Sequence, residues 1–392
     1  MEEKFFEDKE KFKNFLDKGE PPLNYERFLL QSDSDKDRVM AILEGKVVPP
    51  FEVEIQPSSV CNLRCKHCFG KYYSLLPNKM GKKEFDILGD KIDQFKENGF
   101  EIEIVKFCGT TGEPLVNPYT PYALEMFKKR GKKVVIFTNG LNLDKRINGN
   151  GTRYYEPVAR IKRINLSLDA GSEEVFYNLK GRNGFDNIIN SLEKISGIRD
   201  KEKTGLDIRV SYVIGEINCK DVINATRKVK NAGANEIIFR VDFTDEKTIK
   251  NNSEEIIKNI NYAKEYQDSY FKVPSVYSNK EISGEDCGFN SKGIKCFNQN
   301  FWACVGPDCE LYACGHRTYS GIKSIGSLLE NSFRELWLGD KRKKLLDVLP
   351  DNACKNCSPS SKRRNDFMTF LSGVDKNYLK SLIYEGENKI SS

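Results

Sequence analysis

The sequence predicts an α/β protein: a partial barrel of six βα units followed by a small cysteine-rich α+β domain. Strand-like segments alternate with helical patterns, as in a parallel sheet. Three cysteines come directly after the first strand, and a second group follows the last one. A full barrel has about eight units, so six units predict an open one. The six strands are expected at 51–55, 102–107, 133–139, 163–169, 206–214 and 236–243.

Helices are expected between the strands, because apolar residues recur there at spacings of three and four. The first clear pattern runs from Phe85 to Phe95 and the second from Phe185 to Ile195. A third runs from Val222 to Ala232, and Gly233 ends it. These helices would cover the outer face of the sheet.

The strands carry different residues on their two faces. On the fourth strand Asn165, Ser167 and Asp169 share one face, and aliphatic residues fill the other. Arg209 on the fifth strand, with Arg240 and Asp242 on the sixth, continue the polar face. If the apolar faces meet the helices, the polar faces line a cavity for a polar ligand. The alternative is that some of these faces are assigned to the wrong side.

Composition narrows the classes of function. The net charge of +6 is spread over 392 residues, and lysine-rich patches such as 341–344 are typical of a solvated surface rather than a nucleic-acid site. No apolar run reaches the ~18 residues of a membrane span, and residues 1–20 lack the apolar core of a signal peptide. We therefore expect a cytoplasmic protein without a membrane partner. Twelve cysteines in a reducing compartment indicate metal binding or chemistry rather than disulfides.

The segment SSVCNLRCKHCFGKYY, residues 58–73, contains Cys61, Cys65 and Cys68. A thioredoxin-like pair would use Cys65 and Cys68 but leave Cys61 idle. Zinc needs four ligands, and His67 could hardly join the two cysteines that flank it. Three thiolates suit a four-iron cluster in which one iron has no protein ligand. The loop follows the first strand, at the end of a barrel where ligands bind.

This CxxxCxxC pattern resembles the signature of the radical S-adenosylmethionine (SAM) superfamily. Further segments between about 50 and 245 resemble the family's motifs in order: CGTTGEPLVNP (108–118), TNG (138–140), SLDAG (167–171) and LKGRNGF (179–185). The resemblance implies a radical SAM partial barrel with a [4Fe–4S] cluster on Cys61, Cys65 and Cys68. It also implies SAM as a cofactor, together with an external one-electron donor such as a flavodoxin or ferredoxin.

The resemblance also implies roles in SAM binding. Glu113 would hold the methionyl amino group, Asp169 the ribose or carboxylate end, and Arg182 the carboxylate. The residue before the third cysteine is usually aromatic in the family and lies against the adenine, whereas this chain has His67. The full set implied is His67, Gly112, Glu113, Pro114, Ser167, Asp169 and Arg182.

The second group of cysteines lies between residues 296 and 357, with an IGSL…W stretch and a final CxxC. These features resemble the auxiliary-cluster extension called SPASM, or twitch in its shorter form. The resemblance implies one auxiliary [4Fe–4S] cluster, and a zinc ribbon is the alternative. The roles of Cys108, Cys304 and Cys309 stay open. The implied ligands are Cys296, Cys314, Cys354 and Cys357.

By resemblance, the enzyme cleaves SAM to a 5′-deoxyadenosyl radical that removes hydrogen from an unactivated C–H bond. We expect a small sugar-like or other polar substrate, which the radical chemistry oxidises or rearranges. The alternative is a peptide maturase that forms crosslinks or thioethers or epimerises residues. A more distant one is a non-catalytic zinc or iron–sulfur protein that binds nucleic acid. Arg209, Arg240 and Asp242 are substrate candidates, although Arg240 and Asp242 would equally form a salt bridge.

The expected domain organisation follows from these segments. Residues 1–45 form a helical extension, 46–245 the partial barrel and 246–290 a helical connection. Residues 291–360 form the auxiliary-cluster domain, and 361–392 a C-terminal tail or helix.

Overall fold

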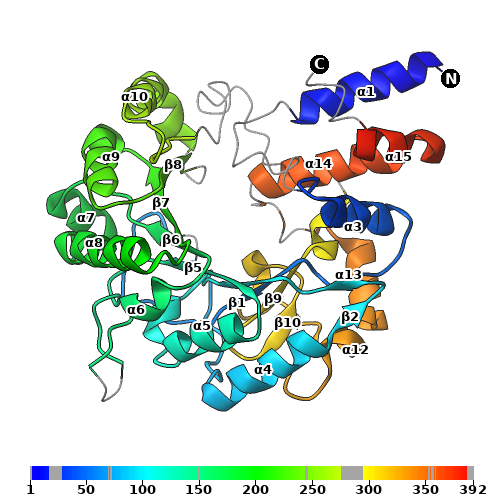
Figure 1. Ribbon diagram of the computed structural model, residues 1–392, viewed down its shortest axis with the longest axis horizontal. Helices are drawn as coiled ribbons and strands as arrows, with labels where there is room; N and C mark the ends of the chain where they lie inside the picture. The colour runs from blue at the N-terminus through cyan, green and yellow to red at the C-terminus, as the bar shows by residue number, and fades with distance from the viewer. Residues whose placement is uncertain are drawn as a thin grey trace.

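The computed structural model describes residues 2–16, 29–68, 70, 73–147, 151–242, 246–274, 295–351, 354, 357 and 359–385. Its centre is one long sheet with helices packed along it (Figure 1). Within the described residues this sheet has nine strands in the order β11-β10-β9-β1-β4-β5-β6-β7-β8.

Six of these strands form the predicted parallel barrel wall. Each pairs in parallel with the next, so their carboxyl ends meet at one edge. The prediction of a partial barrel is confirmed. The observed strands are β1 (Glu52–Ile55), β4 (Ile104–Phe107), β5 (Lys133–Thr138), β6 (Arg163–Ser167), β7 (Asp207–Ile214) and β8 (Glu236–Val241).

Helices cover the outer face of this wall, as Figure 1 shows for α4 to α10. Helices α4 to α9 occupy the connections between successive parallel strands, as βαβ crossovers require, and α10 follows the last strand of the wall. A short hairpin of β2 (Lys96–Glu97) and β3 (Phe100–Glu101) follows the first of them. The helices are α4 (Lys82–Gln94), α5 (Thr120–Lys129), α6 (Tyr155–Val158), α7 (Glu173–Lys180), α8 (Phe185–Glu202), α9 (Val222–Asn231) and α10 (Glu246–Lys264).

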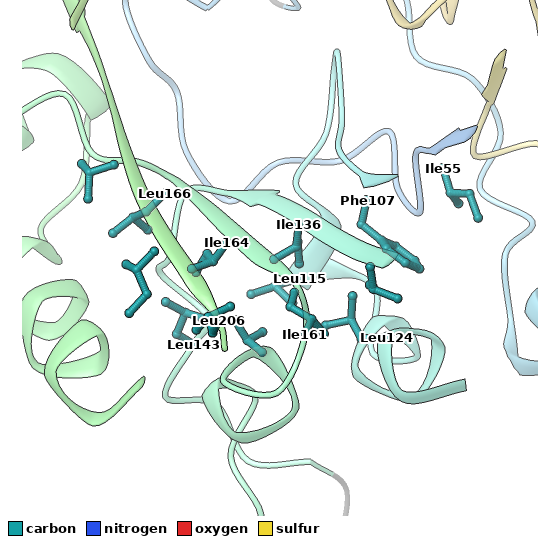
Figure 2. Close-up of a cluster of buried hydrophobic side chains, with 14 of the residues drawn as sticks. Ile55, Phe107, Leu115, Leu124, Ile136, Leu143, Ile161, Ile164, Leu166 and Leu206 are labelled. Atoms are coloured by element: carbon teal, nitrogen blue, oxygen red, sulfur yellow. The ribbon is translucent and has the colours of Figure 1, made fainter. Parts of the chain in front are cut away.

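Alternation along the strands separates a dry layer from a polar one. Ile164 and Leu166 of β6 are completely buried in the layer between sheet and helices, and Figure 2 shows them beside Ile136 and Phe107. Asn165, which lies between them in the sequence, points to the opposite face of the sheet. The apolar faces therefore do meet the helices, as the sequence predicts.

The C-terminal region continues the barrel sheet beyond β1. Strand β9 (Trp302–Val305) pairs in parallel with β1, and β10 (Glu310–Tyr312) pairs antiparallel with β9. Strand β11 (Gly326–Ser327) completes this side. Helices α12 (Phe333–Leu338) and α13 (Asp340–Val348) follow. The cysteine-rich region is therefore hydrogen-bonded to the barrel along the whole of β1, which the sequence did not indicate.

The two ends of the chain pack together, and Figure 1 shows α1, α3, α14 and α15 on one side of the molecule. Phe12, Val39, Phe367 and Leu382 are buried in a common core there, which also takes in Phe297 next to Cys296. No helix in the described ranges combines the length and apolar character needed to cross a bilayer. The four helices are α1 (Glu2–Leu16), α3 (Asp33–Leu43), α14 (Pro359–Gly373) and α15 (Lys376–Glu385).

Candidate active site

The three cysteines of the first motif lie on the loop after β1, and each thiol is partly buried. Burial raises the pKa of Cys65 to about 11; Lys180 opposes this rise, whereas nearby Cys68 and Cys61 add to it. The thiols are thus close enough to interact electrostatically. Three sulfur donors gathered on one sheltered loop fit a [4Fe–4S] cluster with three protein ligands.

The end of α7 holds this loop in place. The amides of Arg64 and Lys66 donate to the carbonyls of Lys180 and Leu179 at 3.1 and 2.9 Å. Helix α7 ends there because Gly181 adopts the left-handed conformation, with φ of 74°, which glycine reaches without strain. The LKGR segment therefore supports the cysteine loop.

A glycine brings a second loop against the first one. A Cβ atom on Gly112 would lie 1.9 Å from the carbonyl oxygen of Ser58, so only glycine fits. Next to it, the amide of Glu113 donates to the carbonyl of Val60 at 3.0 Å. Pro114 then starts a short 3-10 helix, where its missing N–H costs little. The GEP segment is thereby fixed beside Cys61.

Glu113 is only 3% exposed and accepts three hydrogen bonds from the chain. The donors are the hydroxyl of Thr138 at 2.5 Å and the amides of Asn139 and Leu115 at 2.8 and 3.0 Å. Burial raises the pKa of Glu113, and these hydrogen bonds oppose the rise. A carboxylate has about four acceptor positions, so one position is left for a donor on a ligand. Thr138 and Asn139 belong to the TNG segment.

Asp169 and Lys180 form a buried ion pair beside the cysteine loop, their side chains 2% and 3% exposed. His67 Nε2 lies 3.3 Å from the Asp169 carboxylate. The amide of Val213 donates a hydrogen bond to the same carboxylate at 2.6 Å. Burial alone would raise the pKa of Asp169, but Lys180 and His67 hold it well below its usual range. Lys180 also lowers the pKa of Cys65. The pair thus places a cation next to the three thiols.

Sequence reasoning missed Lys180 and selected Arg182 from the same segment. Arg182 is exposed on the turn after α7, whereas Lys180 in the last turn of the helix faces Asp169. Ser167 ends β6 opposite Ser211 of β7. The SAM-binding roles of Ser167 and Arg182 stay predictions. The signal that could have found Lys180 was its position in the same βα connection as Asp169, 11 residues further along the chain.

The structure separates the predicted substrate residues. Arg209 forms a buried ion pair with Glu236, and Arg240 donates to the hydroxyl of Ser211. The strand register places Arg209 and Arg240 at levels four residues apart, about 13 Å along the sheet. Arg209 therefore does not join Arg240 and Asp242 as expected. Their roles toward a substrate stay predictions.

A further charged group lies on the inner face of β1 and β4. Lys106 Nζ is 2.9 Å from Glu52 and 2.7 Å from Glu54, and Gln56 donates to Glu54 at 2.7 Å. Burial would lower the pKa of Lys106, but the two carboxylates raise it well above its usual value. Lys106 was not among the residues that the sequence singled out.

The four cysteines of the second group are near enough to influence one another electrostatically. Burial raises the pKa of Cys314, and nearby Cys296 and Cys354 raise it further. The same two neighbours add to burial in raising the pKa of Cys357 to about 12. Arg317 donates to the sulfur of Cys354 at 3.7 Å. Four thiols are the number and kind of ligands that a closed iron–sulfur or zinc site uses. Among the residues that the structure describes, no three metal-binding side chains are close enough to hold a single ion.

The remaining cysteines near these sites differ in setting. Cys304 of β9 is buried, 3.5 Å from Gln56 Nε2 and 3.7 Å from Glu54. Cys309 has a left-handed φ of 65° in the β9–β10 turn, a position that normally favours glycine. Cys108 follows β4, and burial raises its pKa to about 12. We assign no ligand role to these three.

Comparison with known proteins places the chain in a family. Residues 55–206 match the family model described as the Radical SAM superfamily. This stretch contains the cysteine loop, Glu113 and the Asp169–Lys180 pair. The protein is a radical SAM enzyme, and the radical SAM [4Fe–4S] cluster and SAM are its cofactors.

Individual relatives cover different shares of the chain. The antilisterial bacteriocin subtilosin biosynthesis protein AlbA of Bacillus subtilis is 22% identical over 339 residues, 85% of this chain and 68% of AlbA. A probable GTP 3′,8-cyclase of Saccharolobus islandicus is 29% identical over 196 residues, 48% of this chain and 56% of the relative. The match thus spans little more than half of the cyclase.

Solved structures support the same fold. Streptococcus suis SuiB bound to S-adenosylmethionine superposes with a TM-score of 0.57 at 14% identity, covering 83% of this chain and 76% of SuiB. SuiB bound to the precursor peptide SuiA gives a TM-score of 0.56 at the same identity, with 83% and 75% covered. At this identity the likeness establishes the fold alone.

Proposed function

We propose that this radical SAM enzyme modifies a peptide and uses an auxiliary [4Fe–4S] cluster held by its C-terminal cysteines. The observation that carries the proposal is the match to the bacteriocin biosynthesis protein AlbA, which extends over 85% of this chain and so well beyond residues 55–206. The SuiB fold, solved with a precursor peptide, adds support. This proposal replaces the sequence-based preference for a small sugar-like substrate with the peptide alternative.

The chain's own residues set up hydrogen abstraction at the edge of the barrel. When bound, the cluster and SAM supply the radical that removes a hydrogen atom from the substrate. Cys61, Cys65 and Cys68 would hold the cluster through their three thiolates, and three protein ligands would leave one iron available to SAM. Glu113 offers its remaining acceptor position to the methionyl ammonium group. Its three internal hydrogen bonds fix that oxygen in place before the ligand arrives.

Lys180 is proposed as the cation for the SAM carboxylate. Its charge is buried beside Cys65 and held there by Asp169, whereas Arg182 is exposed. A buried cation interacts with an anion more strongly than an exposed one, because solvent screens it less. Asp169 is accordingly a residue that positions Lys180, as well as the predicted contact for ribose.

The auxiliary ligands are proposed to be Cys296, Cys314, Cys354 and Cys357. Four thiols leave no open iron, so this cluster would serve electron transfer rather than SAM binding. A new bond at the carbon that has lost hydrogen requires the loss of one further electron and one proton. Strand β10 leads to Cys314 and β1 leads to Cys61, and only β9 lies between these two strands in the sheet. That arrangement suits removal of the electron.

A small polar substrate is the second candidate. It is favoured by the similarity to the probable GTP 3′,8-cyclase and by the polar inner wall formed by Lys106, Arg209 and Arg240. Most of these charges are already paired with residues of the chain, such as Glu54 and Glu236. They are therefore less available to a ligand than the sequence suggests.

The two candidates are separated by substrate-dependent SAM cleavage. Reconstituted enzyme with SAM and a chemical reductant is offered either a short peptide encoded beside its gene or GTP. The peptide should stimulate 5′-deoxyadenosine formation and lose about 2 Da for each new bond, by mass spectrometry. Stimulation by GTP, with the peptide recovered unchanged, would favour the small-substrate alternative.

A further inference from the structure

One peptide unit connects the proposed auxiliary site to the SAM-binding loop. A hydrogen bond from the backbone N–H of His316 lowers the pKa of the Cys314 thiol, against the rise that burial causes. The carbonyl of the same peptide unit belongs to Gly315, and the hydroxyl of Thr110 donates to it at 2.6 Å. Thr110 lies two residues before Gly112, in the loop that carries Glu113. The Thr110 hydroxyl, in the predicted SAM-binding loop, therefore contacts the carbonyl of the Gly315–His316 peptide unit. The N–H of the same unit interacts with Cys314, a proposed cluster ligand.

Gln56 extends this connection into a chain of hydrogen bonds. Its Nε2 donates to the hydroxyl oxygen of Thr110 at 3.0 Å, so that hydroxyl both accepts and donates. The Oε1 of Gln56 accepts from the backbone N–H of Thr110 at 3.3 Å, and its second N–H donates to Glu54. The hydroxyl of Thr318 lies 2.6 Å from the Gly315 carbonyl oxygen and 2.8 Å from Oε1 of Gln56, and its single proton can be donated to only one of them at a time. Gln56 is 1% exposed. Its amide is thus fully paired and has one orientation.

The close approach of the two regions depends on a glycine. A Cβ atom on Gly315 would lie 2.4 Å from the carboxylate oxygen of Glu54. Glycine lets the segment after Cys314 lie directly against the inner residues of β1. The contact is therefore part of how β9 and its hairpin dock on the barrel, and it brings the Gly315 carbonyl within reach of Thr110.

Hydrogen bonds in series polarise one another. When Thr110 donates to the Gly315 carbonyl, electron density shifts toward that oxygen, and the His316 N–H becomes a stronger donor. A stronger donor to a thiolate ligand stabilises the reduced cluster, which raises its reduction potential. The hydroxyl of Thr110 therefore has a defined electronic effect at Cys314, apart from its effect on packing.

We propose that Thr110, held by Gln56, is a positioning residue that raises the reduction potential of the auxiliary cluster through the Gly315–His316 peptide. The inference rests on the proposed function, because it requires an iron–sulfur cluster on Cys314. It gives the loop that binds SAM a direct influence on the group that accepts the substrate's electron.

The test is a redox titration of the full-length protein that carries Cys61→Ala, Cys65→Ala and Cys68→Ala. Electron paramagnetic resonance monitors the titration. In this background the auxiliary cluster is the remaining source of signal. Thr110→Val, which exchanges the hydroxyl for a methyl group of similar size, should shift the midpoint potential to a more negative value. Thr110→Ser, which keeps the hydroxyl, should restore the parental potential.

A matched control is Thr226→Val in α9. Thr226 is completely buried, and its hydroxyl donates to the Val222 carbonyl at 2.8 Å, so it loses the same group in a helix of the barrel. The potential should not change in this variant. Gln56→Met removes the donor to Thr110 with little change in volume and should shift the potential in the same direction as Thr110→Val.

The possible results distinguish a failure of this inference from a failure of the proposed auxiliary cluster. Parental potential in Thr110→Val, or equal shifts in the Val and Ser variants, would overturn the role of Thr110 and leave the auxiliary cluster in place. A parent protein without iron would overturn the auxiliary cluster and this inference together. Loss of the cluster from Thr110→Val alone supports the link through the hydroxyl, whereas loss from both variants contradicts it.

Discussion

The two cysteine sites of this protein are built in opposite ways. Cys61, Cys65 and Cys68 lie within eight consecutive residues on one loop, supported by the end of α7. The second site brings Cys296 and Cys314 to Cys354 and Cys357, across 62 residues and several elements. A local motif can be recognised and fixed by a few backbone contacts, whereas a dispersed one depends on the packing of the elements that carry it.

This difference predicts that the second site can be lost without the first. The double variant Cys354→Ala/Cys357→Ala should lose about four irons per chain, because two of four thiols cannot hold the cluster. It should still form 5′-deoxyadenosine but no longer convert the peptide. Iron analysis and product mass spectrometry measure both effects. Loss of SAM cleavage as well would show that the two sites are not independent.

The support for the first site predicts a large effect on stability at Lys180. Lys180→Met leaves Asp169 buried without its cation, which typically costs about 3–5 kcal/mol of unfolding free energy. Urea denaturation of the variant measures this cost. Lys194→Met is the matched control, since its ion pair with Asp144 is about half exposed and worth about 0–1 kcal/mol. Equal losses in the two variants would contradict a structural role for the buried pair.

A smaller effect is expected at Glu113, which acts on the ligand rather than on the loop. Glu113→Gln keeps the shape but removes the charge that would face the SAM ammonium group. The loss should be about 1–3 kcal/mol, or roughly five-fold to 150-fold in the dissociation constant, with both clusters retained. Equilibrium dialysis with labelled SAM gives the affinity. An unchanged affinity would remove Glu113 from the SAM site.

The smallest effect is expected at Arg182. Because this side chain is exposed, its contribution to SAM binding should be about 0–1 kcal/mol, less than about five-fold. The same dialysis assay compares Arg182→Ala with Lys180→Met. A loss at Arg182 as large as at Lys180 would restore Arg182 as the partner of the SAM carboxylate.

Much of the fold was predictable because its signals are local. All six barrel strands lie within the predicted segments, since alternation such as Ile164-Asn165-Leu166 determines which face is dry. The predicted GEP and TNG segments do come together at Glu113. Turn chemistry also acts locally, because Gly181 ends α7 by adopting a left-handed conformation.

The features that were missed depend on contacts between distant segments. Nothing in the sequence of β9 indicates that it pairs with β1 rather than forming a separate domain. The ion pair of Lys180 with Asp169 and that of Lys106 with Glu54 each join two elements. The partners in these ion pairs can be identified only when the three-dimensional arrangement of the strands and helices is known. The common core of the two chain ends, around Phe12 and Phe367, has the same origin.

The central claim is that the chain holds two iron–sulfur clusters, an open one on the local motif and a closed one on the dispersed cysteines. Iron content of anaerobically reconstituted protein, measured with 5′-deoxyadenosine formation, tests it most directly. The account predicts about eight irons in the unaltered protein. It predicts about four irons and no 5′-deoxyadenosine in the Cys61→Ala/Cys65→Ala/Cys68→Ala variant. About four irons before substitution and none after it, or continued 5′-deoxyadenosine formation in the variant, would contradict the account.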